Sequence, residues 1–407
     1  MSKRSMKIIR FISILLISIS LPVILLTYDR TGFWQFSKKP EPHPQTKSSE
    51  LDKNSKELNE GFKAFQEAYD EEFAVYANDI LKQWGEFKDV PPSVWVSYEK
   101  SDNIRRTVNY KTGEVQVEMI IDKDTSINQV RGKLDKAVYR LMNSTEKEAY
   151  KTDVVANRVE QRLSRFENIL QKGEMTNERL FSMKDLLTLK INHDGYIKVW
   201  SKSGNDAVTN IIASAKQDKE IVRVSFKIPH SIHKKAVKYA QVVKAAAERE
   251  KINDELIYAI METESSFNPM AKSHVPAYGL MQIVPRTAGK DATNYLYGKA
   301  KVLAPSYLYK PENNITIGAA YLHGLHYKYM RRVKNKESRV YCAIAAYNTG
   351  ASNVAKAFIN QASFNKAIPE INKLSPREVY DRLKNFLPRK ETRTYIEKVS
   401  KRMEKYL

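Results

Sequence analysis

Two glutamates, Glu262 and Glu264, stand at the end of an amphipathic segment and have the side-chain chemistry that acid–base catalysis needs. Apolar residues recur there at helical spacing and predict a helix over 254–264, with a buried stripe formed by Leu256, Ile257, Ile260 and Met261. Glu264 follows Ile260 by four residues and Met261 by three, so it continues this stripe. Glu262 is rotated onto the face of Tyr258, and we expect it to point outward.

The position of Glu264 should raise its pKa for two reasons. Burial on an apolar face disfavours the anion, and a carboxylate in the last helical turn meets the negative end of the helix dipole. A glutamate that stays protonated near neutral pH can serve as a general acid. The alternative is a carboxylate that neighbouring hydroxyls cap and that has only a structural role.

The C-terminal part of the chain must position Glu264, and its composition is helical. Ser375 and Glu378 form a capping box with Pro376 at the first helical position. The periodicity predicts helices over 232–247, 254–264, 314–330, 338–347, 375–386 and 391–405.

The part before Pro229 mixes helices and strands. The alternating segments 104–110 and 114–121, joined across 111–113, predict a β-hairpin. Further strands are expected at 93–99, 196–200 and 221–228, and helices at 58–84 and within 127–170. We find no catalytic cluster in this part. The fold class is therefore α+β, with an N-terminal α+β domain over 58–229 and a mainly helical catalytic domain over 230–407.

Residues 1–30 have the composition of an export signal or membrane anchor. Basic residues precede the uncharged run from Phe11 to Leu26. No cleavage site with small residues at the right spacing follows, so we expect a retained anchor, with the body of the protein outside the cytoplasm. The proline-rich residues 31–57 are predicted to be an extended linker. This location argues against nucleic acid as a partner, and we expect none.

The formal charge of +21 predicts attraction to an anionic partner, such as an acidic polysaccharide or a phospholipid surface. The single cysteine, Cys342, lies in an apolar run and predicts a buried, inert thiol. It also excludes an internal disulfide framework. His323 and His326 lie one helical turn apart but lack a third ligand at suitable spacing, and His274 is expected at the surface. We expect no metal and no cofactor.

Five ordered motifs between about Lys234 and Lys398 resemble lytic transglycosylases of the soluble, goose-lysozyme-like type. They are Glu264–Pro269 with Ser273; Gly279–Gln282 with Pro285, Thr287 and Ala288; Asn314-Ile315 with Gly318 and Tyr321-Leu322; Ala346–Asn348 with Gly350; and Glu391–Arg393 with Tyr395. The preceding α+β part is similar to the N-terminal region of the membrane-bound lytic murein transglycosylase C group.

The resemblance implies a lysozyme-like catalytic domain that cleaves peptidoglycan glycan strands. In this family a single glutamate, here Glu264, protonates the leaving oxygen of the bond between N-acetylmuramic acid and N-acetylglucosamine. It then deprotonates the muramoyl C6 hydroxyl, which closes a 1,6-anhydro ring without water. Ordinary glycosidases use two carboxylates, whereas the residues here nominate only one.

The resemblance also implies the substrate-binding residues. Ser273 and Gln282 should bond to the sugar or its acetamido group, and Tyr347 should stand near Glu264. Met281, Asn348 and Tyr395 should shape the cleft. For each of these residues the alternative role is packing.

Three differences from the family pattern are visible. Residues 1–30 contain no cysteine, which excludes a lipid anchor and favours an inner-membrane anchor with the enzyme on the periplasmic side of the cell envelope. Pro276 and Thr349 replace small residues, and neither change removes a reactive group. Two other functions stay open: a lysozyme-like hydrolase, and a non-catalytic wall-binding protein. A nucleic-acid binder is the weakest candidate.

Overall fold

The computed structural model describes residues 46–99, 103–181, 208–213, 219–228 and 232–406. The chain divides into two compact units, Met1–Asn54 and Ser55–Leu407. The second unit contains the sheet and the helix that ends at Glu264. The expected anchor, residues 31–45 of the expected linker and the strand at 196–200 lie outside the described residues. The expectation of an extended chain is wrong for residues 46–57, which form the start of helix α2 (Thr46–Trp84) because the helix expected from residue 58 begins earlier. Among the described helices, none combines the length and apolar character that crossing a membrane requires.

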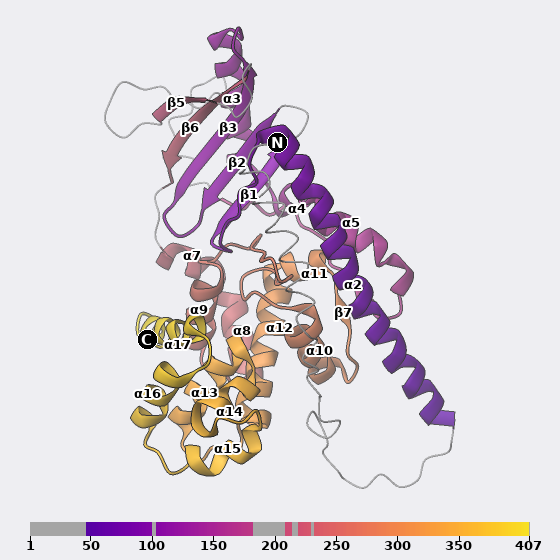
Figure 1. The fold of residues 1–407 in the computed structure, drawn as a ribbon, viewed down its shortest axis with the longest axis vertical. Helices are drawn as coiled ribbons and strands as arrows, with labels where there is room; N and C mark the ends of the chain where they lie inside the picture. The colour runs from indigo at the N-terminus through magenta and orange to yellow at the C-terminus, as the bar shows by residue number, and fades with distance from the viewer. Residues whose placement is uncertain (1–45, 100–102, 182–207, 214–218, 229–231, 407) are drawn as a thin grey trace. The chain divides into compact units, whose positions relative to one another are not determined.

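A five-stranded antiparallel sheet organises the N-terminal part (Figure 1), with its strands in the order β1-β2-β3-β6-β5. The bounds are β1 Val94–Glu99, β2 Ile104–Asn109, β3 Glu114–Asp122, β5 Val208–Ala213 and β6 Lys219–Lys227. The predicted hairpin is confirmed. Its turn uses Gly113 at φ 74°, a conformation that other residues adopt at a cost. Strand β5 was not predicted.

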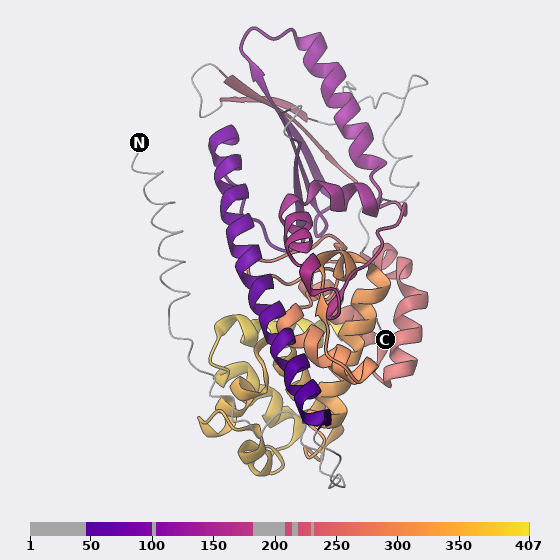
Figure 2. The same cartoon turned by 90° about the vertical axis from the view of Figure 1, so that its right-hand side faces the viewer.

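Helices cover the two faces of this sheet differently. Helix α3 (Ile127–Met142) lies along one face (Figure 2), where Leu134 and Val138 share a core with Val117 and Val222. On the other face, the end of α2 (Thr46–Trp84) brings Ile80 and Trp84 onto Tyr98, Ile120 and Ile221. Because successive side chains of a strand point to opposite faces of the sheet, the strands contribute to two separate apolar clusters.

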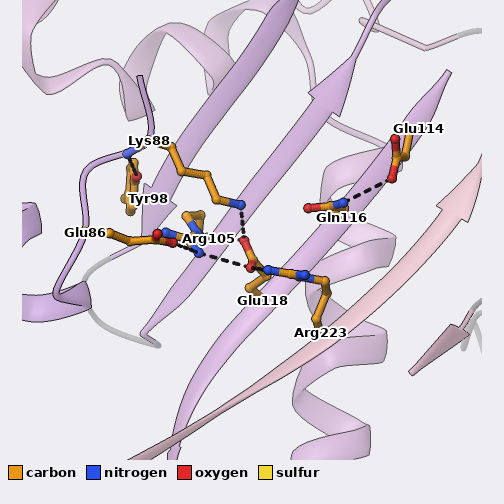
Figure 3. Close-up of polar contacts among 8 residues, drawn as sticks. All are labelled: Glu86, Lys88, Tyr98, Arg105, Glu114, Gln116, Glu118 and Arg223. Carbon is orange, nitrogen blue, oxygen red and sulfur yellow. Dashed lines mark hydrogen bonds and ion pairs between the residues drawn. The ribbon is translucent and has the colours of Figure 1, made fainter. Parts of the chain in front are cut away.

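The buried carboxylate of Glu118 joins the polar side chains that lie on this second face of the sheet (Figure 3). Glu118 accepts hydrogen bonds from Arg105 on β2, from Arg223 on β6 and from Lys88, at 2.7–3.0 Å. Burial alone would raise the pKa of Glu118, but the hydrogen bonds and charges of Arg105 and Lys88 lower it to about 2. The cluster holds three strands and the segment after α2 in one register.

The remaining elements are mostly helices that surround α9. They are α4 Glu146–Thr152, α5 Val154–Arg162, α7 Ile232–Lys238, α8 Ala240–Glu250, α9 Asp254–Glu264, α10 Lys290–Tyr297, α11 Pro305–Tyr309, α12 Pro311–His323, α13 Lys336–Thr349, α14 Ala351–Ile359, α15 Phe364–Ile371, α16 Pro376–Phe386 and α17 Lys390–Met403. The predicted α+β class, with its helical C-terminal part, is confirmed.

Helix α9 matches its predicted bounds, and both hydrogen bonds of the Ser375 capping box are present. The predicted helix over 232–247 is interrupted at Tyr239 between α7 and α8. The predicted helix over 314–330 starts earlier, at Pro311, and widens into a π-type turn from Gly324 to Tyr329. Helices α10, α11, α14 and α15 were not predicted, because each has nine residues or fewer, less than the window of about 11–18 residues in which a helical period is recognised.

The loop that follows Glu264 is braced by the sheet-containing part of the chain. Asp153 accepts hydrogen bonds from Lys272 at 2.8 Å and from Tyr309 at 2.7 Å. Asn268 donates to the carbonyl of Pro92 at 2.8 Å. The two parts share one hydrophobic core, and residues 55–407 form one compact unit. The domain boundary at 229/230 therefore stays a prediction.

Replacing Asp153 by Asn should lower the free energy of unfolding by about 2–3 kcal/mol, because Lys272 loses its buried counter-charge. Burial would raise the pKa of Asp153, but Lys272 and Tyr309 hold it below its usual value. The stabilisation is therefore present at neutral pH and is lost as the pH falls through the folded-state pKa. Urea unfolding at pH 7 and pH 3 measures it. The control Asp381→Asn, at an exposed pair with Arg377, should change stability by less than about 0.5 kcal/mol.

Candidate active site

The carboxyl group of Glu264 sits at the C-terminal end of α9 and contacts a distant helix. The hydroxyl of Tyr395, on α17, donates a hydrogen bond to Oε1 of Glu264 at 2.7 Å. Burial raises the pKa of Glu264 to about 7, the Tyr395 bond opposes this rise, and the negative charge of Glu391 adds to it. The carboxyl group thus exchanges a proton in the range where acid–base catalysts work.

The backbone turns sharply directly after Glu264. Ser266 and Phe267 both have positive φ angles, 53° and 64°, and non-glycine residues in this region store strain. The turn persists because Phe267 is buried and Ser265 donates to the carbonyl of Leu280 at 2.8 Å. Packing therefore holds an unfavourable backbone in place beside the acid.

A second tight turn, Gly279–Gln282, packs against the first and is held by Asn314 of α12. The amide of Asn314 accepts from the backbone N–H of Met281 at 2.8 Å and donates to the carbonyls of Tyr278 and Leu308 at 2.8 Å. A Cβ on Gly279 would lie 2.4 Å from this amide. Only glycine fits at that position.

Met281 and Tyr347 also hold the 279–282 turn in place. The Met281 side chain is fully buried against Gly318 of α12, so it supports the turn from inside the domain. The hydroxyl of Tyr347, on α13, donates to the carbonyl of Met281 at 2.8 Å. The Tyr347 hydroxyl has its pKa raised well above its usual range, first by burial and then by the charge of Glu264. Tyr347 therefore lies close to the acid without bonding to it.

Gln282 and Asn348 complete the polar surroundings. Gln282 has φ 49° and donates to the carbonyl of Gly279 at 3.0 Å. Its Oε1 is buried and accepts no hydrogen bond from the residues that the structure describes. Asn348 accepts from the hydroxyl of Thr392 at 2.7 Å. The Thr392 bond ties α13 to α17, three residues before Tyr395.

Ser273 lies apart from this group of residues. Its carbonyl accepts a hydrogen bond from Tyr69 of α2 at 3.0 Å, and its hydroxyl donates to the carbonyl of Val275. It lines a small cavity of about 80 Å³ together with aromatic residues of α2 and β1. His274 beside it is half exposed and pairs with Asp89, as expected for a surface residue.

The expectation that Glu262 points outward is wrong. Its side chain is only 2% exposed, because the end of α17 covers that face of α9 and supplies Arg402 as an ion-pair partner. Glu262 does share a face with Tyr258, whose ring stacks on Tyr406. Helical phase gave the direction of the side chain correctly but could not show that a distant helix packs there.

Two further residues are placed at the site by the structure. Asn314 is fully buried and holds the 279–282 turn, and Glu391 acts on the pKa of Glu264. Both lie in the motifs quoted from the sequence, but no role was assigned to them. Glu391 precedes Tyr395 by four residues on α17, so the two share a helix face, a signal that spacing alone could have supplied.

Cys342 and His323 have structural surroundings. Cys342 is buried, and burial raises the pKa of its thiol to about 12, which confirms the inert thiol. His323 bonds to the carbonyl of Glu250 at 2.8 Å and stacks on Tyr295. In the described part of the chain, no three His, Cys, Asp or Glu side chains gather as a metal site would require.

The chain is similar in sequence to known proteins over most of its length. The family profile of the Transglycosylase SLT domain matches residues 241–368. Membrane-bound lytic murein transglycosylase C of Pectobacterium atrosepticum is 31% identical over 361 residues, which cover 86% of this chain and 92% of that protein. The chain belongs to the lytic transglycosylase family. The protein of the same name from Yersinia pestis is 43% identical over 179 residues, 44% of this chain and 49% of that one.

Two lytic transglycosylases of solved structure are also similar to this chain. An inactive mutant of lytic transglycosylase Slt from Pseudomonas aeruginosa is 27% identical, with a TM-score of 0.30. The 70-kDa soluble lytic transglycosylase from Escherichia coli is 25% identical, with a TM-score of 0.33. Each match covers 41% of this chain and 24% of the solved chain.

Two substitutions should move the pH dependence of the transglycosylase in opposite directions. Activity that needs protonated Glu264 falls as the pH rises through its pKa of about 7. Tyr395→Phe removes a hydrogen-bond donor that favours the anion, and so raises the pKa of Glu264. The basic limb of the pH profile, where activity falls, should therefore move to higher pH. Glu391→Gln removes a negative charge, so the limb should move to lower pH. Profiles of kcat/KM against pH measure both shifts, and equal limbs in all three proteins would contradict the assignment.

Gly318→Ala should destabilise the transglycosylase by about 1–3 kcal/mol, the usual cost of overpacking a core. Its new Cβ would lie 2.2 Å from Sδ of Met281 and would push the 279–282 turn. Gly132→Ala is the matched control: this position in α3 has open space around it, and alanine there should stabilise by about 0.5–1 kcal/mol. Thermal unfolding of both variants measures the difference.

Proposed function

We propose that this lytic transglycosylase cleaves the β-1,4 bond between N-acetylmuramic acid and N-acetylglucosamine in peptidoglycan and leaves 1,6-anhydro ends. Glu264 acts first as the acid and then as the base. The observation that carries the proposal is the half-buried Glu264 carboxyl group, with a pKa of about 7 and a tyrosine donor at 2.7 Å.

The pKa of Glu264 suits both steps. Near neutral pH about half of the Glu264 side chains carry a proton that can pass to the leaving glycosidic oxygen. Tyr395 occupies Oε1, which leaves Oε2 to carry the proton. After the transfer, the Tyr395 bond stabilises the anion until it accepts the proton of the muramoyl C6 hydroxyl. That hydroxyl belongs to the substrate, so its attack is intramolecular and entropically favoured.

The neighbouring residues fit the recognition of an amino sugar. Oε1 of Gln282 is a buried acceptor without a partner among the described residues, which suits an acetamido N–H or a sugar hydroxyl. Asn348 and Tyr347 would add further polar groups to the substrate-binding surface, and the buried Met281 side chain would support the 279–282 turn from inside the domain. Ser273 would contact the glycan further along, on the loop that the N-terminal part braces.

Hydrolysis is the second candidate, because Glu391 is a further carboxylate close enough to influence Glu264. An inverting hydrolase separates its two carboxyl groups by about 6.5–9.5 Å to admit a water. In that reaction Glu391 would activate the water. In the transglycosylase reaction its role is electrostatic only.

We further propose that the protein works in the cell envelope, held at the inner membrane on the periplasmic side by residues 1–30. The names of the membrane-bound relatives support the envelope location. The net charge of +21 would favour retention on the carboxylates of peptidoglycan stems and on anionic lipid.

Mass spectrometry of sacculi digested by the full-length chain tests the proposed reaction. Anhydro-muropeptides are the expected product, whereas reducing ends would establish hydrolysis. Glu264→Gln should lower the rate by at least about 10³-fold, because it removes the proton donor and acceptor. Glu391→Gln should keep the anhydro product. An active Glu264→Gln variant would overturn the assignment of the acid.

A further inference from the structure

Glu262 is a buried carboxylate that the proposed reaction does not use. Both of its oxygens are occupied by residues from the end of the chain. Oε1 accepts from Nε of Arg402 at 2.9 Å and from Nζ of Lys405 at 3.0 Å, and Oε2 accepts from the hydroxyl of Tyr406 at 2.9 Å. Such a complete set of partners makes Glu262 a fixed point between two helices.

The charges of this cluster bear on the catalytic turn. Burial alone would raise the pKa of Glu262, but bonds from Lys405 and Tyr406 and the charge of Arg402 hold it below its usual range. Glu262 is therefore an anion that offsets two cations. Arg402 also donates to the hydroxyl of Thr263 at 2.8 Å, one residue before Glu264, and its charge acts on Tyr395.

Helix α17 thus contacts α9 at two levels. Tyr395 and Arg402 are seven residues apart, two helical turns, and lie on the same side of α17. Tyr395 bonds to Glu264, and Arg402 bonds to Glu262. The stacked rings of Tyr258 and Tyr406, with centroids 5.1 Å apart, close the end of the contact.

We propose that Glu262 is a positioning residue for the transglycosylase reaction: it clamps the end of α17 onto α9, so that the Tyr395 hydroxyl stays on Glu264 and the charge of Arg402 is cancelled. This inference rests on the proposed role of Glu264. The groups that face Glu264 are Tyr395 and Glu391 from α17 and Tyr347 from α13.

The clamp predicts effects of the same sign in the full-length chain acting on solubilised glycan strands. Glu262→Gln releases the end of α17, so that the Tyr395 donor, which favours the anion of Glu264, is less well held. The basic limb of the pH profile should therefore move up by on the order of half a pH unit, in the direction expected for Tyr395→Phe. For the same reason kcat should fall about tenfold with KM changed by less than about twofold. Arg402→Gln, which removes a partner of Glu262, should also move the limb upward.

The double variant Glu262→Gln/Arg402→Gln separates positioning from simple structural support. Because both single changes break the same contact, the double variant should move the limb no further than Glu262→Gln alone, whereas a merely structural loss would leave the limbs of all variants unchanged while thermal stability falls. Glu397→Gln is the matched control, because it breaks an exposed pair with Lys384 on the same helix. This control should match the parent.

Tyr406→Phe keeps every charge and serves if Glu262→Gln does not fold. It should lower kcat about twofold to threefold and move the limb upward by less than Glu262→Gln does. If Glu262→Gln folds and has the kcat and pH profile of the parent, the clamp is overturned. If Glu262→Gln does not fold, the same result in both Tyr406→Phe and Arg402→Gln overturns the clamp. A parent chain that yields no anhydro product overturns the proposed function instead.

Discussion

The hydrogen bond from Tyr395 to Glu264 is the interaction on which the site depends. It joins residues 131 positions apart in the chain and opposes the effect of burial on the same carboxyl group. Burial without a donor would leave an acid that holds its proton too firmly to act as a catalyst. A donor without burial would leave an ordinary carboxylate. The balance puts the proton in the working range, and it requires α9 and α17 to be held in register.

The surrounding residues hold this register by hydrogen bonds to backbone groups. Asn314 fixes the 279–282 turn, and Tyr347 bonds to the carbonyl of Met281 in the same turn. Such bonds to the main chain set positions more firmly than contacts between long side chains. Ser266, Phe267 and Gln282 keep positive φ angles in this setting, since the packing around them outweighs the local strain.

The sheet-containing part has a structural relation to the site. Asp153, Pro92 and Tyr69 all bond to the loop that follows the acid, so the N-terminal part shapes a segment that a glycan strand would meet. The Glu118 cluster in turn joins β2, β3 and β6 to the segment after α2. A change far from Glu264 can therefore reach the site through the loop rather than through the chemistry itself.

The sequence alone determined the local features, because they depend on neighbours within a few residues. The hairpin over 104–121, the bounds of α9 and the capping box at Ser375 all follow from periodicity and turn chemistry. The same local pattern, together with the ordered motifs, led us to propose Glu264 as the acid. The short helices α10, α11, α14 and α15 were not predicted because each spans too few turns for a helical period to stand out from its surroundings.

Only the tertiary structure decided which distant groups meet. It brought Tyr395 onto Glu264, placed Ser273 against α2, and covered Glu262 with the end of the chain. Helical phase gives the direction of a side chain but not what packs there, so Glu262 was expected in solvent and is buried in an ion cluster. The physical reason is that burial and pKa depend on contacts made across more than a hundred residues.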